Sequence, residues 1–450
     1  MMTSLASAAD FMKGRLDGAD RIFDGVSTDT RTLQNGELFV ALNGPNFDGS
    51  DYVPQASEKG AAAAVVAGKV DCDIAQIRVD DTRRALGRLG ASWRREQSAV
   101  VIGITGSNGK TTLKELTASC LSQTAPTLAT AGNLNNDIGM PLMLTRIEPE
   151  HRYAVIEMGA NHAGEIKYLA SLAEPDVVAI TNAGAAHLEG FGSVEGVAHA
   201  KGEILRSKVR PGVAVLNADD KYFSLWRSWV ADIEVLSFGI DTAADVTAAD
   251  IVTDAGGTAF ELRLPGASVD IRLALPGRHN VRNACAAAAI ATAVGVAPEQ
   301  IQAGLEAVKP VGGRLQPHTG INGAVVYDDS YNANPVSVTA AAEFLAGLEG
   351  EGWFVLGDMK ELGADEAGIH AEVGHAIRKA GVDRLFATGV LCREATQAFG
   401  ANASWFESHD ALIDALRASV TANVNVLVKG SRSMQMEQVV EALRVAGAEN

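Results

Sequence analysis

The 450-residue chain contains few cysteines, few aromatic residues and no long apolar run. Its four cysteines, Cys72, Cys120, Cys285 and Cys392, are far apart and form no CxxC pair. This spacing argues against a zinc site or a dithiol motif and is typical of proteins in a reducing compartment. The N-terminus has no basic segment, and charged residues interrupt its short apolar stretch, so it does not resemble a signal peptide.

Basic residues are also fewer than acidic ones: the chain has 38 Lys and Arg and 55 Asp and Glu, which gives a formal net charge of −17. A chain this acidic repels phosphate backbones, so we expect no nucleic-acid partner. The longest apolar run, 284–297, is shorter than the ~18 residues of a membrane span, so we expect no membrane insertion. These features predict a cytoplasmic protein, which we expect to be a monomer.

The order of strand-like and helix-like segments predicts an α/β fold with three domains. Alternating strands and helices are typical of mostly parallel sheets covered by helices. We expect an N-terminal mixed α/β domain at 1–95, a central P-loop domain with a parallel sheet at 96–310, and a C-terminal Rossmann-like domain at 311–450. The expected strands lie at 36–44, 99–106, 153–159, 176–184, 213–220, 324–330, 353–359, 384–389 and 424–430, with a short buried element at 60–68, and the expected helices lie at 80–97, 107–123 and 277–295.

Two further segments have a distinct pattern. Residues 232–275 contain short alternating runs, which are typical of an antiparallel extension. Pro310, Gly312 and Gly313 mark a linker before the C-terminal domain and are suited to a hinge.

The string TGSNGKTT, 105–112, lies between an expected buried strand and an expected amphipathic helix. Its glycines allow successive N–H groups to point at phosphate oxygens, and the helix adds its positive N-terminus. Lys110 would reach the outer phosphates and the Thr111 hydroxyl would bind Mg²⁺. The match to GxxxxGK[ST] is not strict, because Ile104 stands where the first glycine belongs. An incidental glycine-rich turn is the alternative interpretation.

Seven further strings occur in order: NLNNDIGMP (133–141), TNAGAAHLEGFGS (181–193), AKGEI (200–204), GRHNVRNACAA (277–287), DDSYNANP (328–335), LGDMKELG (356–363) and LVKGSRSM (427–434). Together with the phosphate loop, the chain resembles the Mur ligases, which are ATP-dependent amino-acid ligases of peptidoglycan precursor synthesis. The resemblance implies that D-alanyl-D-alanine is joined to a UDP-N-acetylmuramoyl-tripeptide through an acyl phosphate. It also implies ATP and two Mg²⁺ sites. Residue Ser50 stands where the family often has a histidine.

The resemblance assigns roles to residues of the central domain. Lys110, with Asn135 and Asn136, would act on the phosphates and the incoming carboxylate. The metal ligands would be Thr111, Glu157, His187 and Lys201, the last as a carbamate formed with CO₂. Carbamylation needs a neutral amine, and an unperturbed Lys pKa of ~10.4 makes deprotonation cost about 4 kcal/mol. The alternatives are a solvated loop carboxylate for Glu157, a structural His187 and an exposed helix lysine.

Nucleotide and substrate contacts are implied in the same way. The ATP site would contain Gly106, Ser107, Asn108, Gly109, Lys110, Thr111, Thr112, His279, Asn280, Asn283, Arg314 and Asp329. The substrate sites would contain Ser27, Asp29, Arg31, Asp48 and Gly49 for the UDP-sugar, and Tyr331, Asn332, Asn334, Lys429, Ser431 and Arg432 in the C-terminal domain. N-capping is the alternative for the two asparagines of the alanine-rich helix, and a solvated basic loop is the alternative for 429–432.

Two other functions stay open on the sequence. One is a related amide ligase such as a folylpolyglutamate synthase, which the NLNNDIGMP string disfavours. The other is a P-loop nucleotide switch, although the nearest counterpart of a guanine-reading NKxD is NADD, 217–220. The third residue of the tripeptide, diaminopimelate or lysine, is not determined by the sequence.

Overall fold

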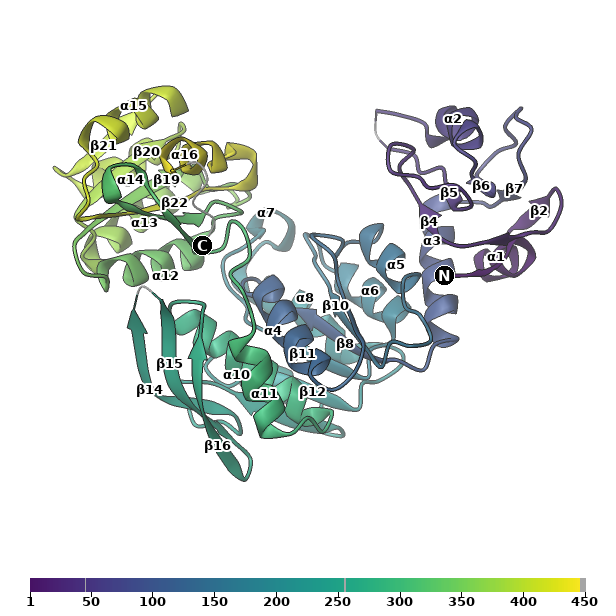
Figure 1. Ribbon diagram of the computed structural model, residues 1–450, viewed down its shortest axis with the longest axis horizontal. Coiled ribbons are helices and arrows are strands. Elements are labelled where there is room, and N and C mark those ends of the chain that lie inside the picture. The colour runs from purple at the N-terminus through teal and green to yellow at the C-terminus, as the bar shows by residue number, and fades with distance from the viewer. Residues whose placement is uncertain (45, 255, 446–450) are drawn as a thin grey trace.

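The computed structural model describes residues 1–44, 46–254 and 256–445, and these form three α/β units arranged along the chain (Figure 1). The central unit lies between the other two, and the N-terminal and C-terminal units stand well apart in this view. No helix within the described ranges is long and apolar enough to span a bilayer.

The N-terminal unit is built on a five-stranded sheet of order β2-β7-β6-β5-β4, in which only the β2–β7 pair is antiparallel. Helix α3 runs from this unit to the central one, as the charged segment 80–97 predicts. Its elements are β1 (Thr3–Ser4), α1 (Leu5–Met12), β2 (Arg15–Asp17), β3 (Ile22–Phe23), β4 (Val26–Ser27), β5 (Leu38–Val40), η1 (Gly49–Tyr52), α2 (Val53–Glu58), β6 (Ala63–Val66), β7 (Gln76–Arg78) and α3 (Thr82–Arg95).

The central unit contains a six-stranded parallel sheet of order β13-β12-β11-β8-β10-β9. Buried apolar strands such as β8 and β10 carry helices on both faces, which is why they have continuous rather than alternating hydrophobic patterns. Its elements are β8 (Val100–Thr105), α4 (Lys110–Ser122), β9 (Thr127–Ala129), α5 (Gly139–Leu144), β10 (Tyr153–Glu157), α6 (Glu165–Ala173), β11 (Val177–Ile180), α7 (Leu188–Phe191), α8 (Val194–Lys201), η2 (Gly202–Arg206), β12 (Val213–Asn217), α9 (Phe223–Ser228), β13 (Glu234–Phe238), β14 (Thr247–Asp254), β15 (Gly257–Leu264), β16 (Ala267–Leu273), α10 (Arg278–Ala293) and α11 (Pro298–Glu306).

The expected antiparallel extension at 232–275 is only partly present. Strands β14, β15 and β16 form an antiparallel three-stranded sheet, but β13 pairs in parallel with β12 and belongs to the central sheet. Helix α9 separates β12 from β13, and such a crossover returns the chain in the same direction. The buried Ser237 and Phe238 at the end of β13 then pack within the central unit.

The C-terminal unit has a six-stranded sheet of order β17-β18-β22-β19-β20-β21, parallel except for β17. Its elements are β17 (Gln316–Thr319), η3 (Ile321–Gly323), β18 (Val325–Asp329), α12 (Pro335–Ala346), β19 (Glu351–Gly357), α13 (Glu366–Ala380), β20 (Arg384–Thr388), α14 (Cys392–Phe399), β21 (Ala403–Phe406), α15 (His409–Ser419), β22 (Val424–Lys429), η4 (Arg432–Met434) and α16 (Glu437–Leu443). The linker before β17 contains Gly313 at φ +73°, and its use as a hinge stays a prediction.

Candidate active site between the central and C-terminal units

The phosphate loop connects the carboxyl end of β8 to the first turn of α4. Gly106 has φ +147°, and a Cβ at this position would lie 1.9 Å from the Thr181 hydroxyl oxygen, so no larger residue fits. Gly109 precedes the helix in the left-handed region, at φ +80°. The Ser107 and Asn108 N–H groups donate to Asn182, which fixes the loop against the strand-end segment that follows β11. The strand, tight loop and helix therefore match the predicted phosphate cradle.

Lys110 is the first residue of α4, and its side chain folds back over the loop. Its Nζ donates to the Gly106 carbonyl at 2.8 Å and to the Ser107 carbonyl at 3.2 Å. Burial lowers the pKa of Lys110, although the Glu157 carboxylate acts in the opposite direction. The amine thus lies against its own loop, held by two of the loop's carbonyl groups.

Glu157 is the last residue of β10 and is only 2% exposed. Its carboxylate accepts hydrogen bonds from the Thr111 hydroxyl at 3.0 Å and from the Asn135 amide at 2.7 Å. No Lys or Arg within the described ranges forms an ion pair with it. A solvated loop carboxylate is therefore the wrong interpretation, because Glu157 is a buried acceptor that lacks a cation. A carboxylate oxygen is the kind of ligand that a hard divalent ion prefers.

His187 precedes α7 and has a left-handed backbone, with φ +53°. Its Nδ1 contacts the carboxylate of Glu361, which comes from the C-terminal unit. Burial is the main cause that lowers the pKa of His187, and Glu361 opposes it.

Lys201 ends α8 and is 1% exposed, so it is not an exposed helix lysine. Its Nζ donates to the Ala160 carbonyl at 3.2 Å and lies 5.1 Å from the centre of the Phe191 ring. Burial, assisted by the charge of Lys110, lowers the pKa of Lys201 to about 7. The sequence does not reveal this desolvation, so the ordinary lysine pKa of ~10.4 does not apply to Lys201 in the folded chain.

The C-terminal unit reaches the phosphate loop through two side chains. Arg314 donates to the Thr111 hydroxyl at 2.9 Å and lies over the ring of Tyr331, 4.4 Å from its centre. Asn334 donates from its amide to the Asn108 side-chain oxygen at 2.6 Å. Residues more than 200 positions apart are thereby brought to the same phosphate-binding segment.

The ends of β18 and β22 carry an ion pair. Lys429 donates to Asp329 at 2.6 Å, and the Lys429 residue is only 3% exposed, so the solvated-loop interpretation does not hold for it. Burial raises the pKa of Asp329, while the charge of Lys429 acts in the opposite direction. Ser431 accepts from the Lys360 N–H at 2.9 Å. Arg432 is exposed and pairs with Glu437 at 3.0 Å.

The first two turns of α10 contribute three of the predicted polar residues, His279, Asn280 and Asn283. The Asn280 amide donates to the Pro276 carbonyl at 2.8 Å, and the Asn283 amide donates to Asn280 at 3.4 Å. Gly277 is the capping residue and no side chain caps this helix, so the N-capping alternative is wrong. Burial lowers the pKa of His279 to about 4, which keeps its ring neutral at physiological pH.

One cleft of about 1230 Å³ collects most of the predicted site residues. Of those residues, it is lined by Ser107, Asn108, Gly109, Lys110, Thr111, Thr112, Asn135, Asn136, Glu157, His187, His279, Asn280, Asn283, Arg314, Asp329, Tyr331, Asn332, Asn334, Lys429, Ser431 and Arg432. Gly106 and Lys201 are not among the lining residues. The cleft also contains Arg83, Asp137, Tyr168, Lys360 and Glu361, which the sequence analysis did not select. Asp137 lies in the string 133–141, and Lys360 and Glu361 lie in the string 356–363, so these strings could have indicated that the three residues belong to the site.

The five predicted UDP-sugar residues do not line this cleft and lie in the N-terminal unit. Arg31 pairs with Asp29 at 2.6 Å, and this partner lowers the pKa of Asp29 to about 2. Ser27 donates to the Asp29 carbonyl, and Asp48 accepts from the Ser50 N–H at 2.8 Å. Gly49 is buried, and a Cβ there would lie 2.2 Å from the Leu42 carbonyl oxygen.

These features define a class of protein, a P-loop nucleotide-binding enzyme whose site is completed by a second α/β unit. Three family models match the chain: "Mur ligase family, catalytic domain" at 22–94, "Mur ligase middle domain" at 104–291 and "Mur ligase, glutamate ligase domain" at 313–432. The chain belongs to the Mur ligase family.

Similar proteins cover nearly the whole chain. The UDP-N-acetylmuramoyl-tripeptide–D-alanyl-D-alanine ligase of Escherichia coli is 46% identical, covering 99% of both chains, and that of Bacillus subtilis is 35% identical, covering 98% of both. A crystal structure of MurF from Acinetobacter baumannii has a TM-score of 0.93 at 36% identity, covering 98% of each chain. A folylpolyglutamate synthase from Mycobacterium tuberculosis is 20% identical, with a TM-score of 0.64 over 80% of this chain and 94% of that one, and shares the fold alone.

Proposed function

We propose that this chain is the ATP-dependent ligase that joins D-alanyl-D-alanine to UDP-N-acetylmuramoyl-tripeptide, releasing ADP and phosphate. The observation that carries the proposal is the convergence of the phosphate loop, Glu157 and the Asp329–Lys429 pair on one cleft, in a chain 46% identical to such a ligase over its full length. The MurF ligase from Thermotoga maritima, 28% identical, is solved with ADP, which supports ATP as the nucleotide. The cytoplasmic location stays a prediction.

The phosphates of ATP would lie on the N–H groups of 106–112, at the positive end of α4. Lys110 would place its ammonium against the transferring phosphate, where charge develops. Arg314 supplies a second cation from the C-terminal unit, already in contact with Thr111. The nucleoside would lie near His279, Asn280 and Asn283.

Glu157 and Thr111 fit one Mg²⁺, because a buried carboxylate without a cation lies against a hydroxyl at the edge of the cleft. His187 and a carbamate on Lys201 would hold a second ion. When bound, Mg²⁺ supplies positive charge against phosphate oxygens.

A carbamate forms when a neutral lysine nitrogen attacks CO₂, makes an N–C bond and loses a proton. The pKa of about 7 for Lys201 supports this modification, because a sizeable share of the amine is neutral near pH 7. Among the residues that the structure describes, the Ala160 carbonyl is the one hydrogen-bond partner of Nζ, and no carboxylate there forms an ion pair with it.

In the proposed reaction the tripeptide carboxylate oxygen attacks the γ-phosphorus of ATP, and the bond to ADP breaks. The amine of D-alanyl-D-alanine then attacks the acyl carbon, and phosphate leaves as the amine loses a proton. Asn135 and Asn136 would orient the carboxylate. The dipeptide would lie on the C-terminal unit near Ser431 and Arg432, since Lys429 is already paired with Asp329.

Phosphate release by the purified chain tests the proposal. We expect release only when ATP, UDP-N-acetylmuramoyl-tripeptide and D-alanyl-D-alanine are all present, with a product heavier by the dipeptide less water. Hydrolysis without either acceptor would indicate a nucleotide switch, and activity with a folate and glutamate would indicate the related ligase. Comparing tripeptides that end in diaminopimelate or lysine identifies the third residue.

A further inference from the structure

The loop that follows β19 brings a carboxylate from the C-terminal unit to a histidine of the central unit. Glu361 has a left-handed backbone, with φ +63°, and its carboxylate contacts Nδ1 of His187. Both residues line the cleft. The pairing therefore exists only while the two units are in this arrangement.

The chemistry of this contact determines the tautomer of the imidazole. A carboxylate accepts hydrogen bonds, so a neutral ring facing it carries its hydrogen on Nδ1. The lone pair is then on Nε2, which is the nitrogen left to bind another partner. A carboxylate in this position also raises the basicity of a ligating histidine and fixes its ring orientation.

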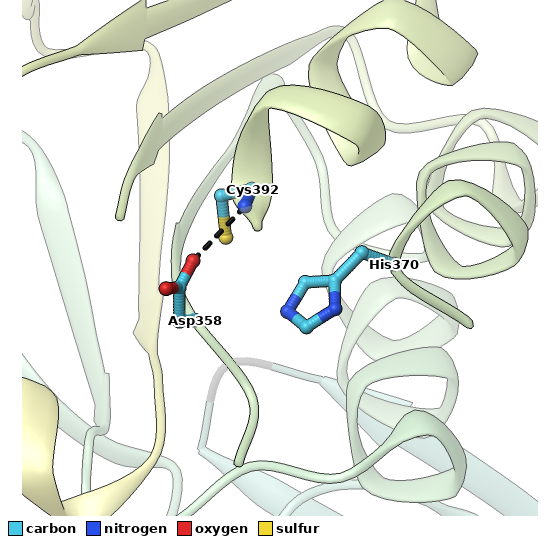
Figure 2. A group of neighbouring side chains, drawn as sticks. All are labelled: Asp358, His370 and Cys392. Carbon is cyan, nitrogen blue, oxygen red and sulfur yellow. Dashed lines mark hydrogen bonds between the residues drawn. The ribbon is translucent and has the colours of Figure 1, made fainter. Parts of the chain in front are cut away.

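Three buried side chains hold the base of this loop, Asp358, His370 and Cys392, which are 2%, 0% and 0% exposed (Figure 2). Asp358 accepts from the Cys392 backbone N–H at 2.9 Å. His370 accepts at Nε2 from the Met359 N–H at 3.0 Å, and its Nδ1 lies 2.7 Å from the Glu366 carbonyl. His370 must therefore be neutral and protonated at Nδ1.

This cluster is the one group of His, Cys and acidic residues in the described ranges whose ligand atoms are close enough to hold a metal ion. Both ring nitrogens of His370 are already bonded to backbone groups, so a metal would have to break one of these bonds. The cluster is better suited to holding the loop than to binding an ion.

The same loop is tied to the segment that follows β22. The Ser431 N–H donates to the Asp358 carbonyl at 3.2 Å, and its hydroxyl accepts from the Lys360 N–H at 2.9 Å. Asp358, Met359 and Lys360 are thus each fixed through a backbone group, and Glu361 is the next residue.

We propose that Glu361 is a positioning residue that sets the tautomer and ring orientation of His187 across the cleft, and that His370 holds the loop carrying it. The inference rests on the proposed function in one respect, the use of the freed Nε2 as a metal ligand. The positioning itself is a property of the protein alone.

Long-range ¹H–¹⁵N correlation spectra of the full chain labelled with ¹⁵N-histidine test this without ATP, substrate or metal. At about pH 8, where imidazoles are neutral, we expect His187 and His370 to show the Nδ1–H pattern. His187→Gln and His370→Gln assign the two signals. A failure of ligation would leave these spectra unaffected, so the two proposals fail separately.

Glu361→Ala should convert His187 mostly to the Nε2–H pattern, whereas Glu361→Gln should keep Nδ1–H because the amide oxygen still accepts. The matched control is Glu189→Ala, which removes an exposed carboxylate two residues from His187 and should change nothing. His370→Phe should act like Glu361→Ala, and His370→Gln, which keeps an acceptor for the Met359 N–H, should restore the signal.

Apparent affinity for Mn²⁺, measured by electron paramagnetic resonance with ATP bound, should fall about 10-fold or more in Glu361→Ala. An unchanged His187 tautomer in Glu361→Ala overturns the proposal. An unchanged His187 signal in a folded His370→Phe overturns the role of His370. If His370→Phe does not fold, His370→Ala, which also removes the acceptor for the Met359 N–H, replaces it, and an unchanged His187 signal in that folded variant overturns the role as well.

Discussion

In the N-terminal unit the Arg31 side chain is 86% exposed and pairs with Asp29, whereas in the cleft the Lys429 side chain is 4% exposed and pairs with Asp329. Both pairs have nitrogen–oxygen distances of 2.6 Å. The partner dominates the pKa of Asp29 and lowers it, while burial dominates the pKa of Asp329 and raises it. The pKa of an ion-paired aspartate is therefore shifted in opposite directions at the two places.

The difference is one of burial, because the Lys429 side chain at the cleft is buried, whereas the Arg31 side chain of the N-terminal unit is exposed. Burial is the main cause that lowers the pKa of Lys110, which lines the cleft, and of Lys201. Charges removed from water interact strongly with their partners. The N-terminal charges remain solvated, so they are suited to recognising a large polar ligand with a small contribution from each residue. Substitutions at Lys110, Lys201, Lys429 and Arg31 test this contrast, from the largest effect to the smallest.

Lys110→Ala should abolish ligation, with a loss of roughly 10³-fold or more in kcat, because the ammonium opposes charge on the transferring phosphate. The fold should persist, because the hydrogen bonds of this side chain within the described ranges are to carbonyls of its own loop. Phosphate release and circular dichroism measure the two effects. Lys208→Ala, at an exposed position, is the control, and normal turnover of a folded Lys110→Ala would exclude this loop as the ATP site.

Lys201→Ala should lose activity by about 10²-fold, and millimolar short carboxylates should restore part of it by replacing the carbamate oxygens. Carbon NMR with ¹³CO₂ should detect the carbamate in the parent and not in the variant. Full activity of Lys201→Arg would refute the carbamate, since a guanidinium does not become an anionic ligand.

The buried amine also predicts a pH-dependent stability. The pKa of Lys201 is about 7 in the fold against an ordinary 10.5, so the unfolded chain binds more protons between these values and stability rises with pH across them. Lys201→Met, without CO₂, should be more stable by up to about 4 kcal/mol at pH 7. The gain should vanish above pH 10.5. Urea unfolding at several pH values measures it, and a pH-independent difference would contradict it.

Lys429→Met should destabilise the C-terminal unit by about 3–5 kcal/mol, because it leaves the Asp329 carboxylate buried without its partner. The double substitution Lys429→Met with Asp329→Leu should recover most of that stability but not activity. Thermal unfolding and phosphate release separate the two outcomes. If Lys429→Met is as stable as the parent, the Asp329 carboxylate does not depend on Lys429 to offset its burial.

Arg31→Ala should have the smallest effect, a slight change in thermal midpoint and a higher KM for the UDP-tripeptide alone. The pKa of Asp29 should rise from about 2 toward its ordinary 3.8. The stabilisation from the pair is present above pH 3.8 and is lost as the pH falls toward 2. A carboxyl titration by NMR measures the pKa of Asp29. A large fall in kcat would contradict the expectation that the exposed charges of the N-terminal unit contribute less than the buried charges at the cleft.

The order of elements and the site's position were accessible from the sequence. Buried apolar runs indicate parallel strands. A glycine-rich string between a strand and a helix indicates a phosphate loop, because the glycines allow the tight turn that joins the two elements. Glu157 follows from the same logic, since ligand sites lie at the carboxyl ends of parallel strands. Each of these features depends on residues close together in the chain, so the sequence pattern is enough to predict it.

What only the tertiary structure decided depends on contacts between distant segments. The Glu361–His187 contact and the Lys429–Asp329 pair each join residues 100 or more positions apart, and nothing in the sequence says which of them meet. The pKa of Lys201 is the clearest case, because the sequence shows a helix lysine with an ordinary amine and the fold removes that amine from water. Desolvation is a property of everything packed around a group, so it is determined only when the whole chain has folded.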